Sequence, residues 1–230
     1  MIKNTFLTVI RKLTEICKNA KAKIAFTGGI ATNIWGRPRL TYDIDGIIKI
    51  DNSKLDVFLK YLRKSGFTCN KENSIKLIHN LPFLTTKYQD MFIDLFIART
   101  EYQNEIFKRI KLIKYKNIKI PLVSIEDLIL LKLISGRTRD DTVAEGKSVT
   151  LNDSEGSKNY ILLQKMRPFL SLRVRFLTLS TTSDIEDIRD IFRFQKQIDF
   201  QYLKKWAKKL NVIIYLEDEL QQLEQIRKGY

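Results

Sequence analysis

The sequence is poor in the residues that mark disulfide-rich, metal-binding or membrane-spanning proteins. It has 2 cysteines and 1 histidine in 230 residues. Cys17 and Cys69 are too few for a disulfide framework and lack the spacing of a metal site, so we expect a reduced cytoplasmic setting. His79 is the only histidine, and nothing else supports a His–acid catalytic pair. No apolar run is long enough for a membrane span, and no signal peptide is recognisable.

Acidic residues are also few in relation to basic ones. The chain has 26 Asp and Glu against 41 Lys and Arg, a formal net charge of +15. This excess favours polyanionic partners such as nucleotide phosphates or RNA. It is equally compatible with an ordinary lysine-rich surface or a basic proteome, so charge alone does not decide whether nucleic acid is a substrate. The length and the 44% hydrophobic content indicate one or two globular domains.

The most informative stretch runs from residue 26 to residue 50. Residues 23–26 are typical of a short buried strand, Gly28 and Gly29 interrupt it, and residues 30–35 suit a short helix. Two glycines between a strand and a helix let backbone N–H groups approach an anion, and the helix N-terminus favours negative charge. The sequence therefore predicts a phosphate-binding turn.

A second strand, predicted over residues 42–50, follows this turn and carries Asp43 and Asp45. Residues two apart on a strand point to the same face, so the two carboxylates lie together. Such a pair is costly unless a cation sits between them, and hard oxygen ligands suit Mg²⁺. A lone Asp-x-Asp on a strand is also common on solvated faces. Next to a glycine turn, it indicates nucleotide phosphoryl transfer.

A third acid lies in an apolar strand predicted over residues 90–97. Asp94 is surrounded there by Met, Phe, Ile and Leu, and a carboxylate buried alone would cost several kcal/mol. The Asp43–Asp45 site would supply its partner through a shared metal. Asp90 is the competing candidate, but it stands at the start of the strand, where a solvated acid is ordinary.

These residues resemble the nucleotidyltransferase superfamily of the polymerase-beta type: Gly28-Gly29, Arg37-x-Arg39, Thr41-Tyr-Asp43-Ile-Asp45 and then Asp94. The resemblance implies an α+β fold, a small mixed β-sheet flanked by helices with a C-terminal helical part. It implies that Asp43, Asp45 and Asp94 are catalytic residues and ligands of one or two Mg²⁺ ions, with Asp94 orienting or deprotonating the attacking hydroxyl. It also implies that Gly28, Gly29 and Arg39 bind a nucleoside triphosphate (NTP).

A helix predicted over residues 125–135, capped by Ser124 and ending at Gly136, extends the resemblance to nucleotidyltransferases of the abortive-infection toxin type. By that resemblance Lys132 contacts the triphosphate, and Arg137 and Arg139 are nearby phosphate or structural contacts. Cations near a helix C-terminus are also favoured simply by the helix dipole. Acceptors in such families are small molecules, proteins or tRNA ends, and nothing in the sequence selects among them or indicates an oligomeric state.

The expected organisation is a catalytic core over residues 1–123 and a C-terminal helical part over 124–140 and 185–230. Residues 141–184 change composition, and joining Arg139-Asp140 directly to residue 185 would restore an Arg-Asp-x-x-Asp helix. We therefore interpret 141–184 as an inserted segment of low order. The alternative is a basic arm that contacts RNA, because its Lys and Arg residues alternate with apolar ones.

The remaining elements follow from periodicity and turn residues. We expect helices at 2–19, 54–64 (capped by Asn52-Ser53) and 101–107, a hairpin of strands 110–115 and 118–122, and helices over 185–228, one of them capped by Asp199. The function predicted is Mg²⁺-dependent transfer of a nucleoside monophosphate from an NTP to an acceptor hydroxyl. The rival is a catalytically silent binding module or a decaying gene product, against which the three intact aspartates argue.

Overall fold

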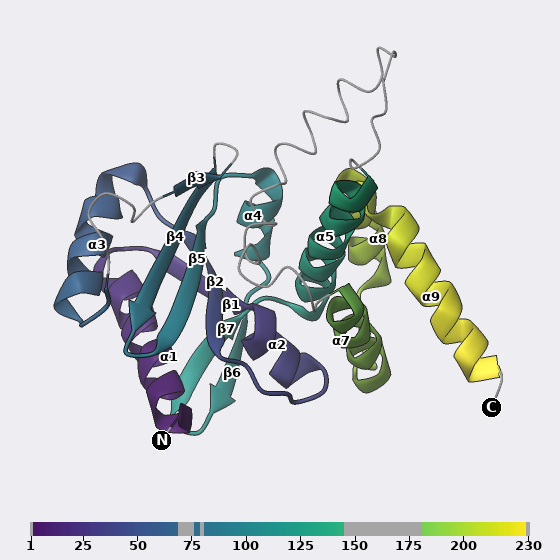
Figure 1. Ribbon diagram of the computed structural model, residues 1–230, viewed down its shortest axis with the longest axis horizontal. Helices are drawn as coiled ribbons and strands as arrows, with labels where there is room; N and C mark the ends of the chain where they lie inside the picture. The colour runs from purple at the N-terminus through teal and green to yellow at the C-terminus, as the bar shows by residue number, and fades with distance from the viewer. Residues whose placement is uncertain (1, 69–75, 79–80, 145–180, 229–230) are drawn as a thin grey trace, which may run out of the picture. The chain divides into compact units, whose positions relative to one another are not determined.

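The computed structural model describes residues 2–68, 76–78, 81–144 and 181–228 (Figure 1). Contacts divide the chain into two compact units, which we describe separately. The first comprises Met1–Asn33 and Pro38–Ser124, and the second comprises Ile34–Arg37 and Ile125–Tyr230.

The first unit is built on a seven-stranded mixed sheet. Its strand order is β3-β4-β5-β2-β1-β7-β6. The strands are β1 (Lys23–Thr27), β2 (Asp43–Lys49), β3 (Lys76–Ile78), β4 (Leu81–Tyr88), β5 (Met91–Ile97), β6 (Lys111–Tyr115) and β7 (Ile118–Leu122). The helical elements of this unit are α1 (Ile2–Asn19), α2 (Gly28–Trp35), the 3-10 turn η1 (Asn52–Lys54), α3 (Leu55–Lys64) and α4 (Glu101–Ile106).

The pairing of the central strands decides which residues stand side by side. β2 is antiparallel to β1, which it follows across α2, and parallel to β5. β4 is antiparallel to β5, and β1 is parallel to β7. The two-residue turn between β6 and β7 places Lys116 at a φ of 51°, the left-handed conformation that a tight hairpin demands.

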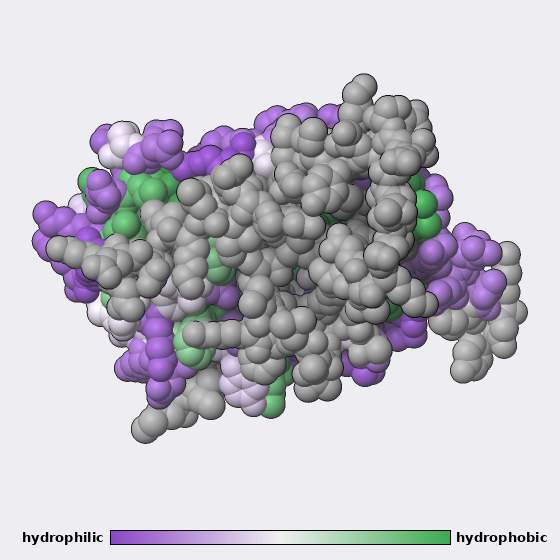
Figure 2. Space-filling model, turned by 45° about the horizontal axis from the view of Figure 1, so that its top comes forward, coloured by the Kyte–Doolittle hydropathy of each residue, from purple (hydrophilic) through white to green (hydrophobic). Residues whose placement is uncertain are grey.

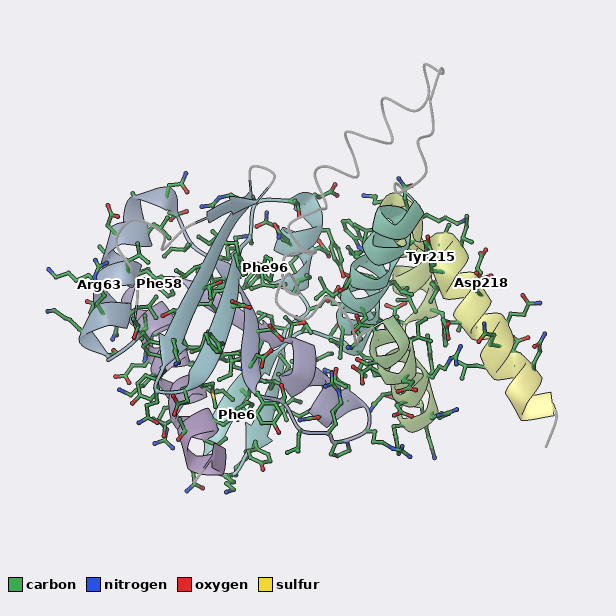
Figure 3. All side chains as sticks on the ribbon, viewed as in Figure 1. Phe6, Phe58, Arg63, Phe96, Tyr215 and Asp218 are labelled. Carbon is green, nitrogen blue, oxygen red and sulfur yellow. The ribbon has the colours of Figure 1, made fainter. Side chains whose placement is uncertain are left out.

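The core of the first unit is apolar on both sides of the sheet. One helical stripe of α1 is buried, formed by Val9, Ile10, Leu13 and Ile16, as its periodicity predicts. The rings of Phe83 and Phe96 lie 4.8 Å apart on β4 and β5. Figure 3 shows Phe96 on the sheet and Phe58 on α3, and both side chains are fully buried.

The described part of the second unit contains four helices, α5 (Ile125–Ala144), α7 (Thr181–Phe194), α8 (Phe200–Lys209) and α9 (Ile213–Lys228). Buried polar pairs join them. The Asp199 N–H donates to Glu126 (2.9 Å), and the Tyr202 hydroxyl donates to Asp127 (2.8 Å), both linking α5 to the start of α8. Arg189 on α7 pairs with Glu219 on α9 at 2.7 Å.

The α+β fold class is confirmed, with several local corrections. The strand β4 is absent from the prediction, because Pro82 near its start weakens the strand signal. The helix α5 continues through Gly136 to Ala144 rather than ending at residue 135. The α3 cap is also wrong: Asn52 and Ser53 form a 3-10 turn, and Lys54 at the cap position makes no side-chain capping bond. Asp199 does cap α8, accepting from the Tyr202 N–H at 2.9 Å.

Most of the proposed inserted segment, residues 145–180, lies outside the described residues, so the insertion stays a prediction. Cys69 and His79 also lie outside the described residues, so the expectations about their chemistry stay predictions. The described ends of the segment, 141–144 and 181–184, belong to α5 and α7. Figure 2 shows that hydrophilic residues cover much of the described surface in that view. No helix in the described ranges has the length and apolar character needed to cross a bilayer.

Candidate functional site

The glycine turn lies directly against the acidic strand. Gly28 begins α2 with a φ of +57°, and a Cβ atom added there would stand 2.7 Å from Cγ of Asp45. No side chain fits in that space, and L residues rarely adopt this conformation. The carboxylate of Asp45 therefore rests on the backbone at the start of the helix, which explains why glycine occupies position 28.

The second glycine makes a similar close approach to the segment that leads into β2. A Cβ atom at Gly29 would lie 2.7 Å from Cβ of Thr41. The Thr41 hydroxyl donates a hydrogen bond to the carbonyl oxygen of Asp43 at 3.3 Å. Thr41 thus packs the turn against the first residue of the acidic strand.

The link between α2 and β2 is held by one side chain. The amide of Asn33 accepts from the Arg39 N–H and donates to the Arg39 carbonyl oxygen, each at 2.8 Å. The Arg39 side chain itself is exposed. This two-point contact fixes the backbone from which Arg39 projects, in the same unit as the glycines and the acids.

The three aspartates share one face of the sheet. In the parallel register of β2 and β5, Asp45 is paired with Asp94 and Asp43 with Phe92. Paired residues on neighbouring strands point to the same side, about 4.8 Å apart, and residues two apart on a strand are separated by about 7 Å. Asp43 is exposed, and Asp45 and Asp94 are half-buried.

The register extends this face into three rows. The acidic row runs across four strands and consists of Thr27, Asp45, Asp94 and Thr85. On one side of it lies an apolar row of buried residues, Ala25, Ile47, Phe96 and Phe83. On the other side lies an outer row of Asp43, Phe92 and Lys87. The carboxylates therefore stand where the apolar core meets solvent, a position in which charge interactions are stronger than in bulk water.

The donor set of this site suits a hard divalent cation. Asp45 and Asp94 present carboxylate oxygens from adjacent positions, with Asp43 on the same face, and Mg²⁺ is commonly held by one or two carboxylates together with water and substrate phosphates. No group of three or more Asp, Glu, His or Cys side chains among the described residues is already gathered closely enough to hold a metal. A cation with its phosphate ligands would therefore have to draw the carboxylates together.

Lys132 lies in the second unit, on α5, and has two acidic partners there. Its Nζ is 2.6 Å from Asp187 and 3.1 Å from Asp184, and the side chains of all three are less than a tenth exposed. A buried ammonium between two carboxylates is held strongly, because removing one member leaves uncompensated charge. Among the sequence-predicted residues, the structure thus brings the glycines, Arg39 and the three aspartates into the first unit and Lys132 into the second. The side chains of Arg137 and Arg139 lie outside the described part.

Sequence reasoning assigned no role to four residues around the acids, Asn33, Thr41, Lys87 and Phe92, although Thr41 belongs to the motif quoted above. For Phe92 a signal existed, because it stands two positions before Asp94 and must share its face. The apolar pattern of the run predicts burial for Phe92, but the structure leaves its side chain 39% exposed. Nothing in the local sequence identifies the backbone contacts of Asn33 and Thr41.

Comparison with known proteins finds similarity in structure only. No protein-family model matches the sequence, and no curated protein matches it. The solution structure of the antibiotic-resistance factor ANT(2'')-Ia is similar over 99% of both chains, with 13% identity and a TM-score of 0.50. An antigenic nucleotidyltransferase-like protein from Paracoccidioides brasiliensis matches over 93% of this chain and 91% of its own, with 16% identity and a TM-score of 0.45. The lincosamide antibiotic adenylyltransferase LnuA covers 56% of this chain and 84% of its own, at 16% identity and a TM-score of 0.36.

Proposed function

We propose that this chain, which has the nucleotidyltransferase fold, transfers a nucleoside monophosphate from an NTP to an acceptor hydroxyl. One observation carries the proposal: Asp45 is paired with Asp94 across two parallel strands while its carboxylate rests against Gly28. A phosphate-accepting turn and adjacent carboxylates then face the same small volume of the first unit. The acceptor class is a small molecule, a protein or an RNA end.

In this proposal each group has a separate task. The backbone around Gly28 and Gly29, at the N-terminus of α2, binds the triphosphate oxygens. Asp43, Asp45 and Asp94 hold Mg²⁺, which offsets phosphate charge and stabilises the charge that develops on the transferring group. Arg39 projects from the backbone that Asn33 fixes and adds positive charge for the phosphates. Lys132 is proposed as a further phosphate contact, which requires its ammonium to exchange Asp184 or Asp187 for the nucleotide.

The transfer step balances without any further reactant. The acceptor oxygen attacks the α-phosphorus, the new O–P bond forms as the bond to the β-phosphate oxygen breaks, and pyrophosphate leaves. The acceptor hydroxyl gives its proton to the carboxylate of Asp94, or to water that this carboxylate orients. Positioning of the two reactants supplies much of the rate enhancement.

The test is label transfer. The purified chain is incubated with each of the four α-labelled NTPs, Mg²⁺ and total tRNA, and with a panel of small hydroxyl acceptors. Asp45→Asn and Asp94→Asn keep size and hydrogen-bonding capacity and remove charge, so transfer should fall at least about 100-fold in each. Asp56→Asn is the matched control, since Asp56 is exposed on α3, and transfer should be unchanged.

The alternative is a nucleotidyltransferase fold that serves as a binding module without catalysis. A folded parent chain that binds no NTP at millimolar concentration would reject the enzyme and favour this alternative. The binding module is also favoured if the parent chain transfers no label and the Asp45→Asn variant still binds NTP.

A further inference from the structure

The aromatic side chain of Phe92 is exposed beside the acids. Phe92 is 39% exposed, although Met91, Ile93, Leu95 and Phe96 on the same strand are buried. It is paired with Asp43 on β2 and stands two residues before Asp94 on β5, about 7 Å along the strand. An exposed ring at this position is adjacent to two of the three carboxylates on the face that they share.

A cation accompanies this ring. Lys87 on β4 is paired with Phe92 in the antiparallel register, and its Nζ lies 5.3 Å from the ring centroid. Lys87 also contacts Asp90 at 3.7 Å, but the Asp90 side chain is fully exposed, and exposed ion pairs of this kind contribute little. The Lys87 ammonium can therefore leave Asp90 for a phosphate at little cost in free energy.

An aromatic face with a neighbouring lysine is suited to a nucleotide. Bases stack on exposed aromatic rings regardless of sequence, while a nearby cation neutralises the backbone phosphate. The net charge of +15 favours a polyanion over a cationic aminosugar, which Lys87 would also repel. Among the acceptor classes of the proposed function, RNA is the one that this surface complements.

We propose that Phe92 and Lys87 form the acceptor subsite and hold the 3′-terminal nucleotide of a single-stranded RNA. The terminal base stacks on Phe92, the phosphate on its 5′ side pairs with Lys87, and the ribose hydroxyl extends toward Asp94. This inference rests on the proposed function, because it names the acceptor for that reaction. Its binding step can nevertheless be measured without catalysis.

The experiment measures two affinities separately. Binding of a fluorescent 12-nucleotide single-stranded RNA is followed by anisotropy, and binding of NTP with Mg²⁺ is followed by calorimetry. Phe92→Ala should weaken RNA binding about 5- to 150-fold and leave NTP binding unchanged, and Phe92→Trp should restore it. Lys87→Gln should weaken RNA binding and reduce the slope of log affinity against log salt by about 0.7. Leu112→Ala is the control, since Leu112 is exposed on β6, and it should change neither affinity.

The outcomes separate the two proposals. RNA binding that depends on Phe92 in a chain that binds no NTP would uphold the subsite and reject the proposed enzyme. RNA affinity unchanged in both Phe92→Ala and Lys87→Gln would overturn the subsite, whether or not NTP binds. The RNA subsite would also be overturned, in favour of a small-molecule acceptor, if the parent chain binds no RNA but binds the cationic aminosugar antibiotic tobramycin, and Phe92→Ala loses that binding.

Discussion

The carboxylate of Asp45 rests directly on the backbone of Gly28, so the glycine turn and the acidic strand are in direct contact. A Cβ atom at position 28 would lie 2.7 Å from Cγ of Asp45 and 2.9 Å from its Cβ. Any side chain there must displace the acid. This contact generates the first prediction.

Gly28→Ala should abolish transfer while leaving the chain folded. The substitution pushes the Asp45 carboxylate out of its position and places a Cβ atom in a left-handed conformation, which costs about 1–2 kcal/mol. The measurement is label transfer together with thermal unfolding. Gly66→Ala is the matched control: Gly66 has a φ of +88°, but its nearest neighbour would be Tyr88 at an ordinary 3.5 Å. Gly66→Ala should lose a similar amount of stability and keep transfer. Equal loss of transfer in Gly28→Ala and Gly66→Ala would contradict the role assigned to the Gly28–Asp45 contact.

Lys132→Ala should lower the free energy of unfolding of the second unit by about 3–5 kcal/mol. The substitution removes the ammonium that lies 3.1 Å from the buried carboxylate of Asp184 and 2.6 Å from that of Asp187, and removing one partner of a buried ion pair is strongly destabilising. Urea unfolding measures the change, with the exposed Lys204 changed to Ala as the control. The Lys132→Ala/Asp184→Asn/Asp187→Asn variant also removes the two negative charges of the buried ion pair and should recover part of the stability. A loss of NTP affinity in that triple variant would support the proposed phosphate contact of Lys132.

Asn33→Ala should reduce transfer more than it reduces stability. The Asn33 amide makes two hydrogen bonds of 2.8 Å to the Arg39 backbone, and the loss of each costs about 0.5–1.5 kcal/mol. The link that carries Arg39 then becomes mobile, so the apparent KM for NTP should rise. Asn33→Asp keeps the acceptor for the Arg39 N–H, so its apparent KM for NTP should lie between those of the parent chain and Asn33→Ala. A KM that is the same in all three proteins would show that the clamp is structural only.

Alkaline pH should destabilise the chain through Cys17. Burial raises the pKa of the Cys17 thiol far above its usual range. The unfolded chain therefore loses this proton first, and stability is retained below the unfolded pKa of about 8.5 and lost as pH rises above it. The expected slope from this group is about −1.4 kcal/mol per pH unit. Urea unfolding between pH 8 and 10 should show it in the parent chain, and Cys17→Ala should show a shallower dependence. If the free energy of unfolding depends on pH equally in the parent chain and in Cys17→Ala, the effect assigned to Cys17 burial is contradicted.

Several parts of the site could be predicted because they depend on local chemistry. The glycine pair between a strand and a helix and the period-two spacing of Asp43 and Asp45 are visible without any tertiary information. Asp94 was singled out because a carboxylate in an apolar strand needs a partner. The roles given to these residues remain predictions, which the substitutions above test.

Other parts depend on which strands become neighbours. The pairing of Asp45 with Asp94 requires β5 to lie parallel to β2, although the two strands are separated in the chain by α3, β3 and β4. The same register leaves Phe92 beside Asp43 at the solvent edge, while the apolar pattern of residues 90–97 indicated burial for the whole run. The pairing of Lys132 with Asp184 and Asp187, 52 and 55 residues away, is likewise beyond any local signal.

The order of the amino acids is enough to identify the chemical groups and their local geometry: a glycine turn, two acids on one strand face and a third acid in an apolar strand. Backbone sterics and side-chain periodicity act over a few residues, so they can be inferred from the order of the amino acids. The folded chain is needed to show that Gly28 touches Asp45, that Asp94 stands beside Asp45, and that Phe92 is exposed with Lys87 over its ring. These contacts join residues far apart in the chain, and they arise from how the sheet buries its apolar rows and which strand pairs that burial allows.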